Sequence, residues 1–185
     1  MPEQDANREA LVLIDIQNDY FPGGRYEVPG STPAAQTAAR LLKAFRRRKQ
    51  PVVHVQHLAT RPGSTFFLPD TPGAEIHALV RPAEGEAVVV KHFPNSFRET
   101  GLLGILQGLG AKRLVLAGMM THMCVDATAR AAFDLGFECT VASDACAAPA
   151  QDFEGTRVPP DLVQASFLAA LSGSYAKVVK GAELL

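Results

Sequence analysis

Three side chains that could carry out covalent chemistry each stand at or just after a run of apolar residues: Asp15, Lys91 and Cys124. A cysteine attacks as its thiolate, and a helix N-terminus or a nearby ammonium favours that form. Cys124 lies in the first turn of an expected helix, so we expect its thiolate to be favoured. A carboxylate can take the thiol proton as a general base. The three residues would therefore suffice for attack on an acyl carbon, if the fold brings them together.

The elements that must position these residues alternate between strand and helix patterns. Apolar runs predict six strands, at residues 10–16, 51–57, 86–91, 113–117, 138–142 and 175–179. Helices are predicted from Pro33, with Thr32 as N-cap, to the basic residues 46–49, and over 99–109, 122–135 and 161–171. This alternation predicts a single domain over residues 1–185, a Rossmann-like three-layer α/β/α fold with a mostly parallel sheet. Sites in such folds lie beyond the C-terminal ends of the strands.

Composition and charge exclude several other classes of protein. Of 185 residues, 47% are hydrophobic and 20% charged, which is typical of a globular chain rather than a disordered one. The net charge of −1 gives no sign of a nucleic-acid partner. No apolar stretch reaches the length of about 18 residues that a membrane span needs, and the N-terminal residues do not resemble a signal peptide. We therefore expect a cytoplasmic protein that binds a small molecule and neither nucleic acid nor membrane.

Two further features complete the outline. The three cysteines are too few for a disulfide framework, and Cys139 and Cys146 are expected to be structural. Residues 58–85 form a long irregular connection, with one helical turn expected near residues 74–79. Loops of this length in compact domains are often functional, so we expect this one to help to select the substrate.

Three segments carry a resemblance to a known family: LVLIDIQNDYFPGG, VVVKHFPNSF and LVLAGMMTHMCVDATARAAFDLGF. They resemble the isochorismatase-like cysteine hydrolase superfamily, which includes nicotinamidases and N-carbamoylsarcosine amidase, over nearly the whole chain. The resemblance implies a catalytic triad of Asp15, Lys91 and Cys124, and a cis peptide bond between Met119 and Met120. It also implies an oxyanion hole formed by the main-chain N–H groups of Met120 and Cys124, and a homodimer or homotetramer.

Other residues near the three motifs are candidates for contact with the substrate. Gln17 belongs to the first motif and is expected close to the substrate, and His92 directly follows Lys91. Tyr20, Phe66 and Phe97 could form an apolar wall, although core packing is the alternative for each. A separate concern is that Thr121 is a suitable N-cap whose hydroxyl group would compete for the N–H of Cys124.

The reaction that this set predicts is hydrolysis of a carbon–nitrogen bond in a small amide or carbamoyl compound, through a thioester and without a cofactor. Within the superfamily, the alternative is the vinyl-ether cleavage of isochorismatases, which does not need the thiol. Nitrilases also combine a carboxylate, a lysine and a cysteine, but the regular βα alternation counts against their sandwich fold. A non-catalytic binding module on the same scaffold is the remaining alternative.

A metal site is not expected, because the resemblance to nicotinamidases fails at their metal ligands. Where those enzymes carry an aspartate and two histidines after the second strand, this chain has His57, Ala59 and Thr65. We therefore predict that nicotinamide is not the preferred substrate. The alternative is a zinc site formed by His54, His57 and His77. The alternation of a strand opposes it, since the first two of these histidines are three positions apart and point to opposite faces.

Overall fold

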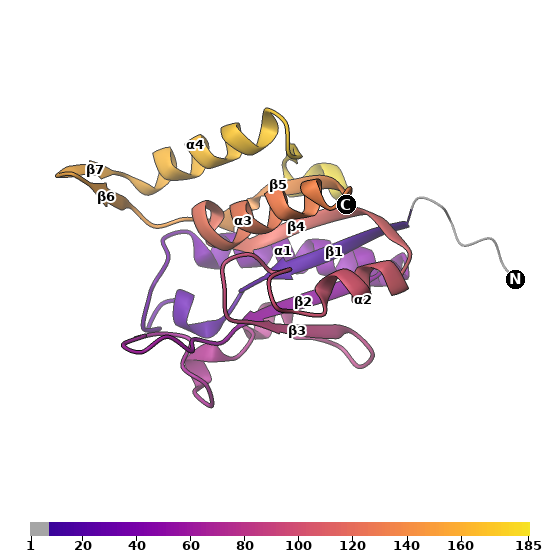
Figure 1. Ribbon diagram of the computed structural model, residues 1–185, viewed down its shortest axis with the longest axis horizontal. Helices are drawn as coiled ribbons and strands as arrows, with labels where there is room; N and C mark the ends of the chain where they lie inside the picture. Colours follow the sequence, from indigo (N-terminus) through magenta and orange to yellow (C-terminus); the bar gives the residue numbers. More distant parts are fainter. Residues whose placement is uncertain (1–7) are drawn as a thin grey trace, which may run out of the picture.

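A six-stranded parallel sheet forms the centre of the computed structural model, which describes residues 8–185 (Figure 1). The strand order is β3-β2-β1-β4-β5-β8. The strands are β1 (Arg8–Ile14), β2 (Val52–His57), β3 (Ala87–Lys91), β4 (Ala111–Met119), β5 (Glu138–Ala147) and β8 (Lys177–Val179). The predicted fold class is confirmed. Residues 1–7, which include part of the N-terminal segment judged for a signal peptide, lie outside the described residues.

Helices cover both faces of the sheet, and the alternation along β1 shows how the layers are joined. Leu11 and Leu13 belong to the core under α1 (Ser31–Arg47), whereas Val12 and Ile14 belong to the core under α2 and α3. Helix α2 spans Leu102–Gly108, α3 spans Asp126–Asp134 and α4 spans Pro160–Ser172. Strand β1 is buried on both faces for this reason, as its nearly continuous apolar sequence predicts.

Several boundaries differ from those that the sequence predicts. Helix α1 begins at Ser31 after Gly30, which has a left-handed conformation, so Thr32 lies within the helix and is not its N-cap. Strand β5 continues five residues beyond its predicted end, to Ala147. It is followed by an antiparallel hairpin of β6 (Gln151–Phe153) and β7 (Thr156–Val158) that the sequence analysis missed. These three-residue strands are too short to show periodicity.

The chain crosses from one half of the sheet to the other between β3 and β4. Strands β2 and β3 lie on one side of β1, and β4 pairs with its opposite side. The C-terminal ends of β1 and β4 are therefore neighbours at a topological switch point, where open α/β sheets bind their ligands. Among the described residues, no helix is both long enough and apolar enough to cross a membrane.

Candidate active site

Asp15 and Lys91 form a buried ion pair at the C-terminal edge of the sheet. Asp15 directly follows β1 in a left-handed conformation (φ 50°), and Lys91 is the last residue of β3. The Lys91 Nζ and Asp15 Oδ2 atoms are 2.6 Å apart, and both side chains are 0% exposed. The other carboxylate oxygen, Oδ1, has no hydrogen-bond partner among the described residues. This oxygen is therefore available to accept a proton.

The ammonium group of Lys91 joins the ends of three neighbouring strands. Besides its contact with Asp15 after β1, it donates to Nδ1 of His57 at the end of β2 (3.0 Å) and to the carbonyl oxygen of Phe93 (3.1 Å). Burial opposes the charge, but the nearby anionic groups outweigh burial and raise the pKa of Lys91. Lys91 is thus held by one ion pair and two hydrogen bonds, and its raised pKa favours the charged form.

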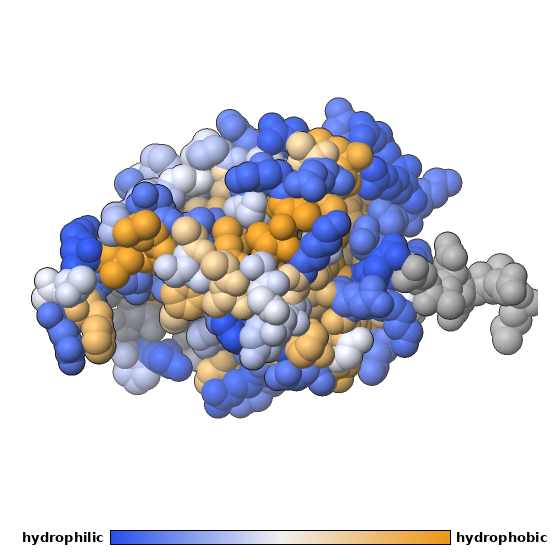
Figure 2. Space-filling model, turned by 90° about the horizontal axis from the view of Figure 1, so that it is seen from above, coloured by the Kyte–Doolittle hydropathy of each residue, from blue (hydrophilic) through white to orange (hydrophobic). Residues whose placement is uncertain are grey.

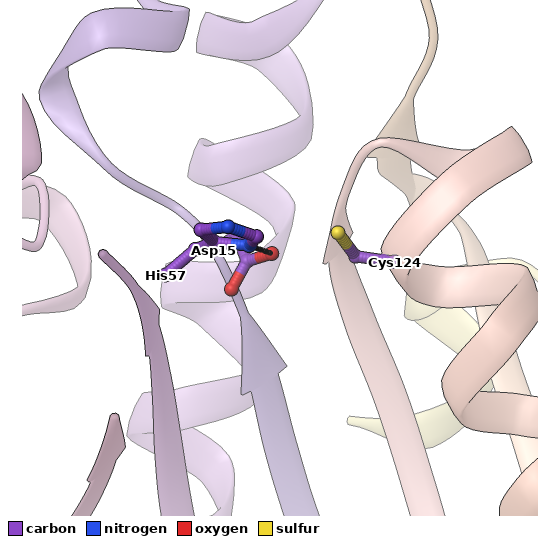
Figure 3. Close-up of side chains that lie close together, drawn as sticks. All are labelled: Asp15, His57 and Cys124. Carbon is purple, nitrogen blue, oxygen red and sulfur yellow. Dashed lines mark ion pairs between the residues drawn. The ribbon is translucent and has the colours of Figure 1, made fainter. Parts of the chain in front are cut away.

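His57 also belongs to this cluster of side chains, although sequence reasoning considered it only as a residue at the position of a metal ligand. Burial lowers the pKa of His57 to about 4, because its effect outweighs the raising effect of the Asp15 charge, and the charge of Lys91 acts in the same direction as burial. The ring is therefore neutral near pH 7, and its Nδ1 lies 3.9 Å from Asp15. Figure 3 shows His57 and Asp15 side by side, with Cys124 across from them. No sequence pattern near residue 57 reveals this contact, because Lys91 lies 34 residues further along.

Cys124 lies in a π-helical turn, Thr121–Val125, between β4 and α3. Such turns are rare and often mark functional sites; the sequence predicts only an ordinary helix from residue 122. The ligand atoms of Asp15, His57 and Cys124 all lie within 4.8 Å of one another. Burial, followed by the charge of Asp15, raises the pKa of the Cys124 thiol well above its usual value. The resting residue is a neutral thiol, which corrects the expectation of a favoured thiolate.

The main-chain hydrogen bonds around Cys124 pass over its N–H group. The carbonyl oxygen of Met120 accepts hydrogen bonds from the N–H groups of Met123 and Val125, and skips the N–H of Cys124 between them. The hydroxyl group of Thr121 donates to Gln164 of α4, so it does not act as the N-cap that would compete for this N–H. The peptide bond between Met119 and Met120 is cis.

A cavity of about 350 Å³ opens above Cys124, within the range of small-molecule sites. Its wall includes four residues that the sequence analysis selected: Tyr20, Phe66, His92 and Met120. Residues 59–61 and 63–67 form much of the rest, so part of the long connection after β2 does border the site. The expected helical turn near residues 74–79 is instead two short 3-10 turns, Pro72–Ala74 and Ala78–Val80.

Two predicted substrate contacts lie elsewhere. Gln17 is 0% exposed, and its amide group donates to the carbonyl oxygens of His57 and Ala74 and accepts the N–H of His57. It therefore holds two loops together in place of contacting a substrate. Phe97 packs against Phe137 in the core beside α2 and α3 (ring centroids 6.1 Å apart) and does not line the cavity. Motif membership alone did not show which way either side chain points.

The three histidines of the alternative zinc site are dispersed. His54 is buried and contacts Glu86 (2.8 Å), whereas the ring of His77 stacks on Phe21 (centroids 3.7 Å apart). Among the described residues, one group of His, Cys and acidic side chains is close enough to hold a metal: Asp15, His57 and Cys124. Lys91 occupies Nδ1 of His57 and Oδ2 of Asp15. A divalent cation would face its positive charge, so these residues do not fit a metal site.

Comparison with known proteins shows the family of this chain. A protein-family model, the Isochorismatase domain, matches residues 9–158. The uncharacterized isochorismatase family protein YddQ of Bacillus subtilis (strain 168) is 52% identical over 169 residues, which cover 91% of this chain and 94% of YddQ. The maleamate amidohydrolase of Pseudomonas putida KT2440 is 31% identical, over 72% of this chain and 70% of that enzyme.

The fold comparison gives the same result. The crystal structure of an isochorismatase from Pseudomonas putida KT2440 has a TM-score of 0.91 and 33% identity, and the match covers 100% of this chain and 94% of that one. The family model spans most of the chain and ends at the last residue of the short hairpin. The protein therefore belongs to the isochorismatase family and is a hydrolase of that family.

Proposed function

We propose that this protein is a metal-independent cysteine hydrolase that cleaves the carbon–nitrogen bond of a small amide or carbamoyl compound through a thioester. The observation that carries the proposal is the position of the Cys124 thiol at the floor of a cavity, close to a buried carboxylate that has one unpaired oxygen. The similarity to an enzyme named maleamate amidohydrolase supports the amide as the bond that is broken. Neither a metal nor a cofactor takes part in the steps below.

Asp15 is the general base that starts the reaction. Because the thiol of Cys124 is neutral at rest, its proton must leave as the sulfur attacks the carbonyl carbon, and Asp15 Oδ1 is free to accept it. Lys91 holds the Asp15 carboxylate in place and stabilises the negative charge that develops on sulfur. Burial thus keeps the nucleophile protonated at rest, and Asp15 removes the proton when an electrophile occupies the cavity.

The main-chain N–H groups of Met120 and Cys124 stabilise the oxyanion of the tetrahedral intermediate. A donor of this kind contributes roughly 3–4 kcal/mol to transition-state stabilisation. The carbon–nitrogen bond then breaks, and Asp15 returns its proton to the leaving ammonia or amine. A water molecule, deprotonated by the same carboxylate, attacks the thioester, and the acid leaves as the thiol of Cys124 is restored.

Ammonia release from a panel of small amides, ureides and carbamoyl compounds tests the proposal. We expect Cys124→Ala and Asp15→Asn each to lower turnover about a thousandfold or more while the circular dichroism spectrum stays unchanged. Cys139→Ala is the matched control, because Cys139 is buried away from the cavity, and it should retain activity. A covalent acyl adduct of the substrate on Cys124, detected by mass spectrometry after acid quench, would identify the thioester.

Two results would contradict the mechanism. If Cys124→Ala keeps most of its activity on any substrate found, the thiol is not the nucleophile, and acid catalysis of the kind used for vinyl ethers replaces it. If none of the amides, ureides and carbamoyl compounds is hydrolysed while isochorismate is, the carbon–nitrogen bond is the wrong target.

A further inference from the structure

The wall of the cavity carries positive charge without a balancing acid. Among the described residues that line it, Arg61 is the only one with a full charge, and no aspartate or glutamate is among them. The carboxylate of Asp15 lies beneath the cavity and is offset by Lys91 at 2.6 Å. The cavity therefore presents a net positive potential to whatever enters it, which favours an anionic ligand over a cationic one.

His57 adds a directed hydrogen-bond donor to the same wall. The Lys91 ammonium group can only donate hydrogen bonds, so Nδ1 of His57 must accept from it. The proton of the neutral imidazole ring is therefore on Nε2. The side chain is 21% exposed and lines the cavity. Among the described residues, the side-chain hydrogen bond of His57 is made through Nδ1, and Nε2 takes part in none. The donor is thus fixed in direction and unused.

Arg61 lies close enough to His57 for its charge to act on the imidazole ring. Its positive charge is one of the causes that lower the pKa of His57. Both residues border the same cavity as Cys124, one at the end of β2 and the other four positions later in the connection that follows. A guanidinium and an N–H group that border the same cavity form a suitable set for a carboxylate oxygen pair.

We propose that Arg61 and Nε2–H of His57 form an anion-binding subsite, so that the protein acts on small amides that also carry a carboxylate or a similar anionic group. This inference rests on the proposed function, because it concerns the molecule whose carbonyl carbon Cys124 attacks. The subsite fixes the charged end of the substrate, and the amide end then reaches the thiol. A cavity of about 350 Å³ accommodates a molecule of this kind.

A pair of alkylating reagents tests the subsite without knowledge of the substrate. Iodoacetate and iodoacetamide are nearly equal in size and differ in charge. With either reagent the sulfur of Cys124 forms a bond to the methylene carbon, the carbon–iodine bond breaks, iodide leaves and the thiol proton goes to Asp15 or to water. Mass spectrometry of peptides measures the rate at Cys124, and the tripeptide glutathione gives the reference ratio for a free thiol.

The expected result is a higher iodoacetate-to-iodoacetamide rate ratio at Cys124 than at glutathione. Arg61→Gln should lower this ratio about tenfold and leave the iodoacetamide rate nearly unchanged, because the variant loses a hydrogen bond to the charged reagent. Arg61→Lys keeps the charge and should restore part of the ratio. Arg47→Gln is the matched control, since Arg47 is an exposed residue on α1 that does not line the cavity.

A second variant tests the histidine separately. In His57→Asn the amide oxygen can occupy the position of Nδ1 and still accept from Lys91, whereas nothing reaches the position of Nε2. We expect this variant to lower the iodoacetate rate more than the iodoacetamide rate. Loss of both rates by the same factor would assign His57 a role in holding Lys91 alone, and would overturn its place in the subsite.

The outcomes separate this inference from the proposed function. If Cys124 reacts with both reagents at the glutathione ratio, and Arg61→Gln leaves that ratio unchanged, the subsite does not exist but the nucleophile stands. If Cys124 reacts with neither reagent, the result contradicts the proposed function, since Cys124 is then not a reactive nucleophile. As a direct check, succinamate should be hydrolysed with a lower KM than succinamide, and Arg61→Gln should remove this difference.

Discussion

Two residues at the site are held by charge pairing and are shielded from bulk solvent. Asp15 and Lys91 are both fully buried, and their contact compensates for the loss of hydration of two ions. Replacing one member of a buried ion pair is costly, because the other ion then stays buried with neither its partner nor water to stabilise its charge. The pair therefore belongs to the stability of the protein as well as to its chemistry.

Lys91→Met is expected to destabilise the protein by about 3–5 kcal/mol, because it leaves the Asp15 carboxylate buried without its partner. The double variant Asp15→Asn/Lys91→Met removes both charges and should lose less stability than the sum of the two single variants. Urea unfolding followed by circular dichroism measures each free energy. A double variant that loses the full sum would show that the two side chains do not stabilise each other.

Glu86 gives the protein a stability that depends on pH. Burial raises the pKa of this carboxyl group, but hydrogen bonds from Arg46, Ala83 and His54 outweigh burial and lower it to about 2. A carboxylate whose pKa is lowered on folding stabilises the protein above its unfolded pKa of 4.5. That contribution is lost as the pH falls from about 4.5 through 2.

Glu86→Gln should therefore lower the free energy of unfolding at pH 7, and the difference from wild type should shrink below pH 4.5 and vanish near pH 2. We expect about 1 kcal/mol, because Arg46 is 36% exposed and solvent screens the pair. Urea titrations across this pH range provide the measurement. Glu84→Gln, a change at an exposed neighbour, should show no such pH dependence. An equal pH dependence in both variants would rule out the contacts of Glu86 as the cause.

At the level of elements, the approach of β4 to β1 depends on a glycine. Gly118 has φ 137°, and a Cβ atom there would collide with the main-chain carbonyl of Ile14, the residue before Asp15. The strand that precedes Asp15 and the strand that leads to Cys124 can be adjacent at this point only because no side chain separates them.

Gly118→Ala should lower the free energy of unfolding by about 3 kcal/mol or more, through steric overlap and an unfavourable φ together. Gly136→Ala is the matched control, since Gly136 also has a positive φ (86°) but open space around it, and should cost about 1–2 kcal/mol. Unfolding midpoints in urea compare the two. Equal losses would mean that the contact with Ile14 does not limit this position.

The sequence predicts helices and strands well where interactions within one segment determine the structure of that segment. Each of the six strands of the sheet is an apolar run, and the helix ends at Gly110 and Gly136 follow from the positive φ that glycine permits. The π-helical turn at Thr121–Val125 was missed, because its register depends on contacts with α4, including the bond from Thr121 to Gln164. Local patterns do not contain such contacts.

The same limit applies to the site. The motifs located Asp15, Lys91 and Cys124 at the sheet edge, where the structure brings them together. The role of His57 depends on a bond to a residue on another strand, and the raised pKa of the Cys124 thiol depends on burial by the whole fold. Both properties are set by long-range packing, which the order of residues alone does not reveal.

For the whole molecule, exposed apolar side chains gather around α4 and the hairpin. Phe153, Leu162, Leu135 and Phe133 are between 45% and 71% exposed. Figure 2 shows apolar residues spread across the face that contains this region. Large apolar surfaces on soluble proteins commonly mark an interaction site. They are consistent with the homodimer or homotetramer that the family resemblance implies.

Light scattering coupled to size-exclusion chromatography should give a mass of two or four times 19.8 kDa at micromolar concentrations. The physical reason is that association removes apolar side chains from water. Dilution over a hundredfold range provides the control, since a true oligomer with finite affinity dissociates at a defined concentration. A mass of one chain at every concentration would contradict the expectation.

The position of Lys91 on an edge strand makes activity more fragile than the fold. Strand β3 lies at the edge of the sheet, with Val88 and Val90 each more than 40% exposed, and edge elements open locally at lower free energy than the core. When β3 detaches, Asp15 loses its counter-ion and His57 loses the donor that fixes its ring, while β1, β4 and β5 remain paired. Turnover should consequently disappear at a lower urea concentration than helical structure, and amide hydrogens of β3 should exchange with solvent before those of β1.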